Sequence, residues 1–105
     1  MSQFDNGMIG KFVLVRCRDA GVHAGVLEAY NGRECLLKAA RRLWFWKVNK
    51  GPTGDFLNGL ALGGVNTGSK LSAPVARIHL TENCEIIECT AEAEASIKGF
   101  EVFNA

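Results

Sequence analysis

Residues 39–47 read Ala-Ala-Arg-Arg-Leu-Trp-Phe-Trp-Lys and hold both tryptophans of the 105-residue chain. Alternate side chains of a strand point to opposite faces of its sheet. In a strand through this segment, one face carries two indoles and two cations, namely Lys38, Arg42, Trp44 and Trp46. The opposite face carries Leu37, Ala39, Leu43 and Phe45, with Arg41 as its charged member. Because a core needs only the apolar face, the indole face predicts a binding surface for a flat, anionic ligand such as a nucleotide, or for a protein.

The segment ends a predicted meander of three strands. Residues 12–15 form a short apolar run bounded by charge, which is typical of a buried strand. Residues 22–30 predict the second strand. The dipeptide Asn31-Gly32 then predicts a hairpin, because both residues accept positive φ. Residues 34–46 predict the third strand, bent or broken near Ala39-Ala40.

A short helix is predicted after this meander. Apolar residues at positions 56, 57, 60 and 61 lie on one face of a helix. Thr53 or Asp55 is expected to cap its start, and Gly63-Gly64 to end it. Gly59 inside the helix costs about 1 kcal/mol relative to alanine, so the helix is expected to be weak.

The remaining sequence predicts two strands and a second helix. Residues 66–74 are polar and predict a loop, and residues 75–81 and 85–89 predict a second pair of strands. A last helix begins at Thr90 and ends at Gly99, with the tail docking through its apolar residues. The predicted fold is mainly β with two short helices, a small bent barrel of the SH3 or Sm type in the order β-β-β-α-β-β-α. It forms a single domain over 1–105, with residues 1–7 flexible.

Composition narrows the class of protein. The formal net charge of +1 argues against a protein that coats duplex DNA. No apolar run is long enough for a transmembrane helix, and no signal peptide is visible, so we expect a cytoplasmic protein that does not enter a membrane. The chain's four cysteines, at positions 17, 35, 84 and 89, form no C-x-x-C pair. We therefore expect buried free thiols, and neither a metal site nor a cofactor.

Two groups of residues are candidates for ligand binding. Bases stack on indole rings, and guanidinium groups bind phosphate bidentately, so Trp44 or Trp46 is expected to stack a base and Arg41 or Arg42 to hold phosphate. Arg42 is preferred, because Arg41 lies on the core side. There Arg41 is expected to pair with Glu28, Glu34 or Asp55, or to leave the core through a bend. The alternative is that the tryptophans fill a core or a subunit interface.

The loop of residues 63–70 supplies the second group. Its order Gly68-Ser69-Lys70 is not that of a P-loop, which requires Gly-Lys-Ser/Thr after a strand. Backbone N–H groups together with Thr67, Ser69 and Lys70 are expected to close over an anion, unless the segment is an ordinary solvated loop.

No catalytic arrangement is visible. His23 and His79 are the only histidines, and neither has a metal-binding spacing or a partner placed for general-base catalysis. A Ser/Cys–His triad cannot be assembled from the sequence. The expectation is a protein that is not an enzyme.

The chain resembles a family of small tailed-phage and prophage proteins with no settled activity. The resemblance is carried by residues 21–28 (Gly-Val-His-Ala-Gly-Val-Leu-Glu), by the Ala-Arg-Arg-Leu-Trp-Phe-Trp core at 40–46 with Ala39 before it, and by residues 80–82, 85–90 and 96–98. It covers most of the chain from about Phe12, and the chain departs from it at residues 49–54.

A phage origin, combined with the chemistry of the candidate residues, leads to a functional hypothesis. The chain is expected to be a non-enzymatic accessory protein that sequesters an anionic nucleotide signal, of cyclic-nucleotide or ADP-ribose type, and so blunts host defence. One alternative is a module that binds a host or phage protein through its aromatic stripe. Another is single-stranded nucleic-acid binding. A homo-oligomer with Trp44 or Trp46 near an interface is expected, because a small barrel leaves apolar surface uncovered.

Overall fold

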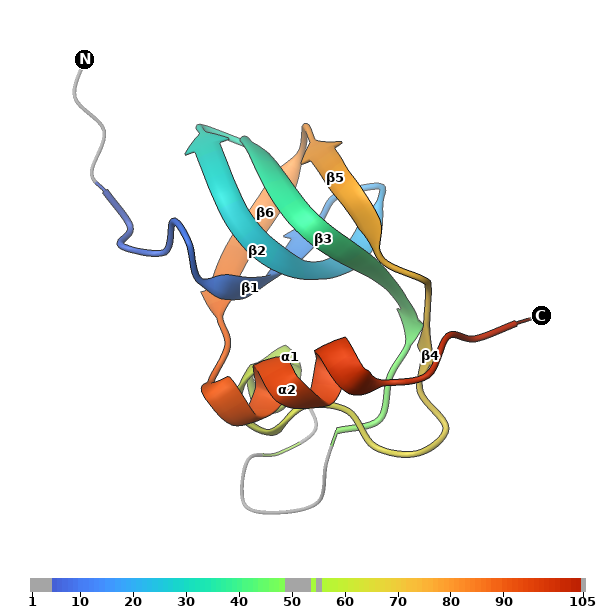
Figure 1. Ribbon diagram of the computed structural model, residues 1–105. Coiled ribbons are helices and arrows are strands. Elements are labelled where there is room, and N and C mark those ends of the chain that lie inside the picture. The colour runs from blue at the N-terminus through green and yellow to red at the C-terminus, as the bar shows by residue number, and fades with distance from the viewer. Residues whose placement is uncertain (1–4, 49–53, 55, 105) are drawn as a thin grey trace.

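The computed structural model describes residues 5–48, 54 and 56–104. Within them the elements of Figure 1 follow in this order: β1 (Phe12–Cys17), β2 (Gly21–Asn31), β3 (Glu34–Phe45), α1 (Leu57–Gly63), β4 (Lys70–Leu71), β5 (Val75–Leu80), β6 (Asn83–Glu88) and α2 (Ala91–Gly99). The prediction of a mainly β protein with two short helices is confirmed. The short strand β4 is an addition to the predicted loop of residues 66–74, where two residues pair with the end of β3.

The strands form one antiparallel sheet in the order β4-β3-β2-β1-β6, and β5 pairs with β3 beside β4. The sheet curves around a common interior, as Figure 1 shows. No ladder joins β5 to β6 within the described residues, so the sheet stays open. The prediction that β5 and β6 pair with each other is wrong: the curvature carries β5 to β3 and β6 to β1.

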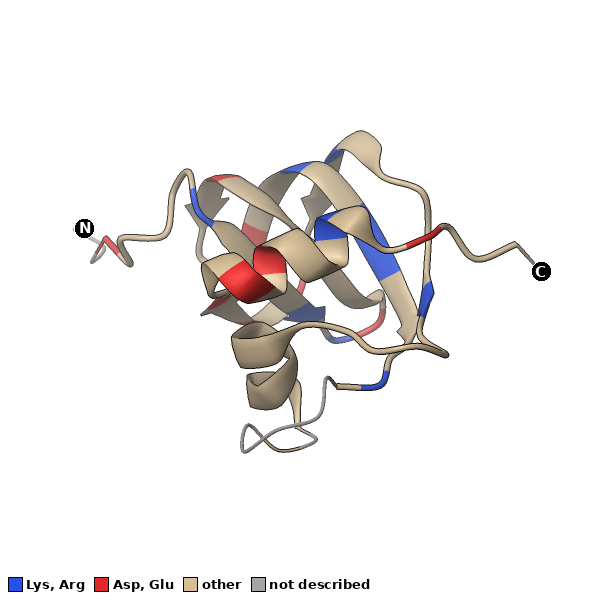
Figure 2. Ribbon diagram, turned by 60° about the horizontal axis from the view of Figure 1, so that its bottom comes forward, with Lys and Arg blue, Asp and Glu red and all other residues tan. Residues whose placement is uncertain are grey.

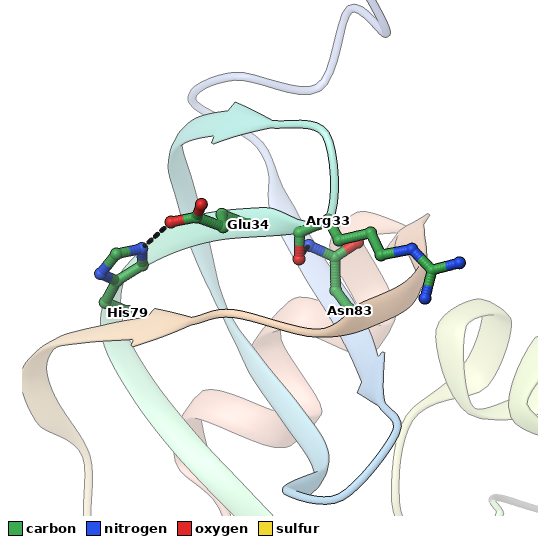
Figure 3. Close-up of polar contacts among 4 residues, drawn as sticks. All are labelled: Arg33, Glu34, His79 and Asn83. Carbon is green, nitrogen blue, oxygen red and sulfur yellow. Dashed lines mark hydrogen bonds and ion pairs between the residues drawn. The ribbon is translucent and has the colours of Figure 1, made fainter.

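Asn83 fixes the chain where β5 passes into β6. Its backbone N–H and its side-chain amide both donate hydrogen bonds to the carbonyl of Arg33, at 2.8 and 2.6 Å. Arg33 lies in the turn between β2 and β3, so these bonds join two distant turns (Figure 3). The turn itself is centred on Gly32 and Arg33, and only Gly32 has positive φ, at 59°. The hairpin prediction is confirmed, but its centre lies one residue later than Asn31-Gly32.

Two apolar clusters stabilise the sheet, one on each face. β1 is buried on both faces: Phe12 and Leu14 contribute to one cluster, and Val13 and Val15 to the other. The first cluster packs these side chains against Leu60 and other residues of the two helices, which lie together on one side of the sheet (Figure 1). Burial on both faces explains the uninterrupted apolar run of β1.

Strand β3 bends where the sequence predicted it. Ala39 has a φ of 49°, the only positive value among the described non-glycine residues. The pairing of β2 with β3 shifts register between Ala24 and Val26, opposite this point. A Cβ on Gly25 would lie 2.8 Å from the carbonyl oxygen of Lys38 and 3.1 Å from the Cα of Ala40. The bend therefore requires glycine on the neighbouring strand.

The helices begin and end largely as predicted. The Thr90 side chain accepts a hydrogen bond from the backbone N–H of Ala93 at 3.1 Å and so caps α2. Helix α1 ends at Gly63 and is followed by the C-cap Gly64, which has a φ of 85°. Its N-cap is Phe56, which makes no side-chain cap bond. The predicted caps Thr53 and Asp55 do not occupy that position, and both lie outside the described residues.

Candidate functional site

The end of β3, strand β4 and the C-terminal tail form an exposed surface that combines aromatic rings with cations. We call this surface the Trp44 surface. Its members are Arg42, Trp44, Phe45, Lys70 and Phe103. Four of them, all but Phe45, line a hollow of about 160 Å³ together with Leu71 and Ser72. Arg42 and Trp44 both point to solvent, as strand alternation predicted.

Pairing between β3, β4 and the tail positions these side chains. Phe45 pairs with Lys70, which brings the Lys70 side chain beside the end of β3. The backbone N–H of Phe103 donates a 2.9 Å hydrogen bond to the carbonyl of Leu71, which holds the tail along β4. The rings of Trp44 and Phe103 then lie 5.5 Å apart at an interplanar angle of 57°. Trp44 is nevertheless 69% exposed, so most of the residue remains accessible to a ligand.

Lys70 lies over this pair of rings. Its ammonium is 4.9 Å from the centre of the Trp44 ring and 5.1 Å from that of Phe103, with Phe45 at 6.0 Å. These distances are those of cation–π contacts. Lys70 and Arg42 thus place positive charge on the hollow beside the indole.

Arg41 points into the protein and not toward the Trp44 surface. Its guanidinium donates hydrogen bonds to four backbone carbonyls, those of Ser72, Ile97, Phe100 and Glu101, at 2.7, 2.6, 2.7 and 3.3 Å. The residue is 4% exposed, and burial lowers the pKa of its guanidinium. Arg41 therefore anchors the end of α2 and the start of the tail, which carries Phe103 to the surface.

The expected carboxylate partners of Arg41 are engaged elsewhere. Glu28 pairs with Arg77 at 3.2 Å and Glu34 pairs with His79 at 2.8 Å, so the prediction is wrong for both. Asp55 lies outside the described residues. Carbonyl groups satisfy the buried guanidinium without a second buried charge.

Trp46 is separated from Trp44. The pairing of β3 with β4 shifts register between Leu43 and Phe45, and β3 ends at Phe45. Trp46 is half-buried and packs against the cluster beneath the helices. The prediction that both tryptophans share one exposed face is wrong for this reason, and Trp46 matches the alternative in which a tryptophan fills a core.

The loop residues Thr67, Ser69 and Lys70 do come together. With Phe103 and neighbouring residues they line a second hollow, of about 310 Å³. Ser69 is buried, and its hydroxyl donates to the carbonyl of Asn66 at 2.8 Å while accepting from the backbone N–H of Lys47 at 2.9 Å. Its hydroxyl is therefore occupied in holding the loop, whereas Thr67 is exposed. Lys70 and Phe103 belong to both hollows.

His79 has a partner that the sequence did not reveal. Its Nε2 donates a 2.8 Å hydrogen bond to Oε1 of Glu34 (Figure 3). The pair borders a hollow of about 240 Å³. Both side chains are more than half exposed, so water screens the contact and the carboxylate orients the ring only weakly. We therefore rank this place below the Trp44 surface.

His23 is completely buried. Its Nε2 donates a 2.9 Å hydrogen bond to the carbonyl of Ala20, and Nδ1 has no hydrogen-bond partner among the described residues. Burial lowers the pKa of the ring, against a smaller opposing effect of the bond to Ala20. The ring therefore stays neutral and inaccessible to a ligand.

The cysteines follow the prediction of buried thiols in part. Cys17 and Cys35 are buried and Cys89 is half-buried, whereas Cys84 is exposed. Burial raises the thiol pKa of Cys35 to about 11 and that of Cys89 to about 12. Thiols with such pKa values are poor nucleophiles at neutral pH.

The acidic residue Glu101 lies beside Lys70 and Phe103 on the larger hollow, whereas other acidic residues gather on α2. Two glutamates lie in the first turn of α2, where Figure 2 shows acidic residues gathered on the helix.

Among the described residues, no group of three His, Cys, Asp or Glu side chains is placed to hold a metal ion. None of the helices there is both long and apolar enough to span a membrane.

Comparison with known proteins assigns the chain to a family. A family model described as Domain of unknown function (DUF6948) matches residues 10–97. No curated protein and no solved structure matches the chain. The matched range includes Arg42, Trp44 and Lys70 and ends before Phe103.

Proposed function

The chain belongs to the family described as Domain of unknown function (DUF6948), and we propose that it is a non-enzymatic protein that binds an anionic nucleotide on the Trp44 surface. One observation carries the proposal: Trp44 is 69% exposed and lines one hollow together with Lys70 and Arg42. An indole left open to water costs hydrophobic free energy, and two adjacent cations attract anions. A base bound to a phosphate uses both features.

In the proposed complex a base stacks on Trp44. Stacking of a base on an aromatic side chain contributes about 1–3 kcal/mol. The exposed Arg42 guanidinium holds a phosphate through two parallel hydrogen bonds, and Lys70 adds a third charge-assisted contact. Thr67 supplies a hydroxyl at the second hollow for an extended phosphate or ribose group.

The size of the hollow favours partial enclosure of the ligand. Sites that enclose small molecules usually measure about 300–1,000 Å³, whereas the hollow between Arg42 and Phe103 measures about 160 Å³. It accommodates part of a nucleotide, and the neighbouring hollow accommodates the rest. A ligand with two linked parts, such as a cyclic-nucleotide or ADP-ribose type of signal, suits this arrangement better than a free base.

The proposed biological role is that of a protein that binds the nucleotide and does not convert it chemically. The cations of the Trp44 surface are not joined by a histidine, since His23 is buried and His79 lies on a different hollow. We infer that the ligand is held intact. On the basis of the phage resemblance, we propose that the protein sequesters a host nucleotide signal.

We also infer that the strand order corresponds to a small SH3- or Sm-type barrel, extended by β4 and the helices.

A protein partner is the second candidate, favoured by exposed apolar side chains. Trp44, Phe45, Val102 and Phe103 are between 36% and 69% exposed and belong to neighbouring segments. Exposed clusters of aromatic residues are typical of protein interfaces. A second copy of the chain or a host protein would bury them, and light scattering above the 11.4 kDa monomer mass would reveal the homo-oligomer.

A thermal-shift screen against mono-, di- and cyclic nucleotides tests the proposal. A ligand present at 100 times its Kd stabilises the protein by about 2.7 kcal/mol, which raises Tm by on the order of 10 °C for a domain of this size. Trp44→Ala is expected to abolish the shift. The matched control is Phe56→Ala, which removes an aromatic side chain that is 85% exposed on another part of the chain. A screen in which no nucleotide shifts Tm contradicts the proposal.

A further inference from the structure

Lys70 occupies the place where a base would stack. Its ammonium lies over the rings of Trp44 and Phe103, at 4.9 and 5.1 Å from the ring centres. Within the described part of the chain it forms no ion pair. The contact with the rings is therefore its principal attachment.

We propose that Lys70 makes the Trp44 surface selective for phosphorylated nucleosides. In the free protein its ammonium covers the rings of Trp44 and Phe103. When a nucleotide binds, the ammonium moves to the phosphate and leaves the indole face to the base. The inference rests on the proposed nucleotide binding and assigns Lys70 a role beyond general attraction of anions.

The position of Lys70 between two hollows permits this movement. The side chain lines the smaller hollow with Arg42 and Trp44, and also the larger one with Thr67 and Glu101. A lysine side chain has four flexible methylene groups, so the ammonium can change hollows while β4 stays paired with β3. The backbone of Lys70 need not move.

The two kinds of ligand differ in what they offer the displaced cation. A nucleoside must displace the ammonium from the rings into water, and it has no negatively charged group with which the ammonium can pair. A nucleotide supplies a phosphate oxygen, which forms a stronger contact with the ammonium than an aromatic ring does. Lys70 therefore opposes nucleoside binding and favours nucleotide binding, and its removal should shift the two affinities in opposite directions.

Isothermal titration of adenosine and ADP into the wild-type protein and Lys70→Ala tests this. An exposed cation–π contact corresponds to about a twofold to fivefold change in affinity, so Lys70→Ala should bind adenosine that much more tightly. The same variant should bind ADP about tenfold more weakly, because the charge-assisted contact is lost. Lys70→Arg should restore the preference for ADP.

Lys11→Ala serves as the matched control. Lys11 is an exposed lysine directly before β1, and in the sheet β1 is separated from β4 by β3 and β2. It should leave both affinities within twofold of wild type. An unchanged melting temperature of Lys70→Ala shows that the variant is folded.

The outcomes separate the inference from the function on which it rests. If wild type binds ADP but Lys70→Ala weakens ADP and adenosine equally, or leaves adenosine unchanged, the displacement of Lys70 is contradicted while nucleotide binding stands. If wild type binds neither ligand nor any other nucleotide in the screen, both proposals are contradicted.

Discussion

The guanidinium of Arg41 donates a 2.6 Å hydrogen bond to the carbonyl of Ile97, a residue 56 positions later in the chain. The same group also reaches the carbonyls of Phe100 and Glu101. This side chain thus joins the third strand to the last helix and to the tail that carries Phe103. Arg41 and Trp44 belong to the same segment, residues 39–47. This segment contributes Trp44 to the surface and, through Arg41, also holds the tail that carries Phe103.

Arg41→Ala should therefore lower stability more than Arg42→Ala. Removing the Arg41 side chain removes hydrogen bonds to four carbonyls, one buried and three partly buried, at an expected cost of about 3 kcal/mol or more. Arg42 is exposed, so its removal should change the free energy of unfolding by less than about 0.5 kcal/mol. Urea denaturation of both variants measures the difference. Equal losses would contradict the assigned orientations of the two arginines.

The two tryptophans should behave in opposite ways. Trp46→Ala removes a half-buried ring that packs on the cluster beneath the helices, and an expected loss of about 2–3 kcal/mol follows. Trp44→Ala should stay within about 0.5 kcal/mol of wild type, because the ring is mostly exposed. Guanidinium melts followed by circular dichroism test this. A larger loss for Trp44→Ala would show that the register at the end of β3 differs.

Stability should fall as the pH decreases below the ordinary histidine value of 6.5, because burial lowers the pKa of His23 in the folded state. The unfolded chain takes up a proton on this ring first, so the ring's contribution is present above pH 6.5 and is lost as the pH falls through the folded-state pKa. Unfolding free energies of wild type and His23→Gln, compared at several values from pH 7.5 to pH 5, measure it. The difference between the two proteins should shrink on acidification. A constant difference would contradict a neutral buried His23.

Gly25→Ala should destabilise the sheet severely. The added methyl group would meet the backbone of the neighbouring strand, with 2.8 Å to the Lys38 carbonyl oxygen. Neither backbone can yield without breaking the bend at Ala39, so a loss of several kcal/mol or failure to fold is expected. Gly99→Ala is the control, because nothing lies within 4 Å of its added Cβ. Equal melting temperatures for the two variants would contradict the described approach of β2 and β3.

The sequence indicated the fold class and part of the site because those features depend on local patterns. The alternation of side chains along a strand predicted that Arg42 and Trp44 lie on an exposed face. Gly32 predicted the turn of the hairpin, and Thr90 predicted the start of the last helix. The bend at Ala39-Ala40 was also expected. Each of these rests on residues within a few positions of one another.

The remainder depends on contacts between distant segments. Trp46 follows the end of β3 at Phe45, where the pairing shifts register against β4, a strand of two residues without a pattern of its own. Phe103 joins the surface because carbonyls of the tail accept hydrogen bonds from Arg41. Every residue has a backbone carbonyl, so the sequence does not show which carbonyls accept these bonds. The pairing of His79 with Glu34 likewise arises from the ladder between β3 and β5. The spacing of Trp46, Phe103, His79 and Glu34 along the chain does not predict these contacts.

Tryptophan fluorescence during titration with nucleotides tests nucleotide binding on the Trp44 surface most directly. Trp44 is mostly exposed whereas Trp46 is half-buried, so a base stacked on Trp44 should quench the emission of wild type and of Phe56→Ala. Trp44→Phe keeps an aromatic ring at the site but removes the reporter, and its remaining emission from Trp46 should stay nearly constant. Saturable quenching in wild type that is lost in Trp44→Phe is the predicted result. Quenching that persists undiminished in Trp44→Phe, or its absence in wild type with every nucleotide tested, would contradict the account.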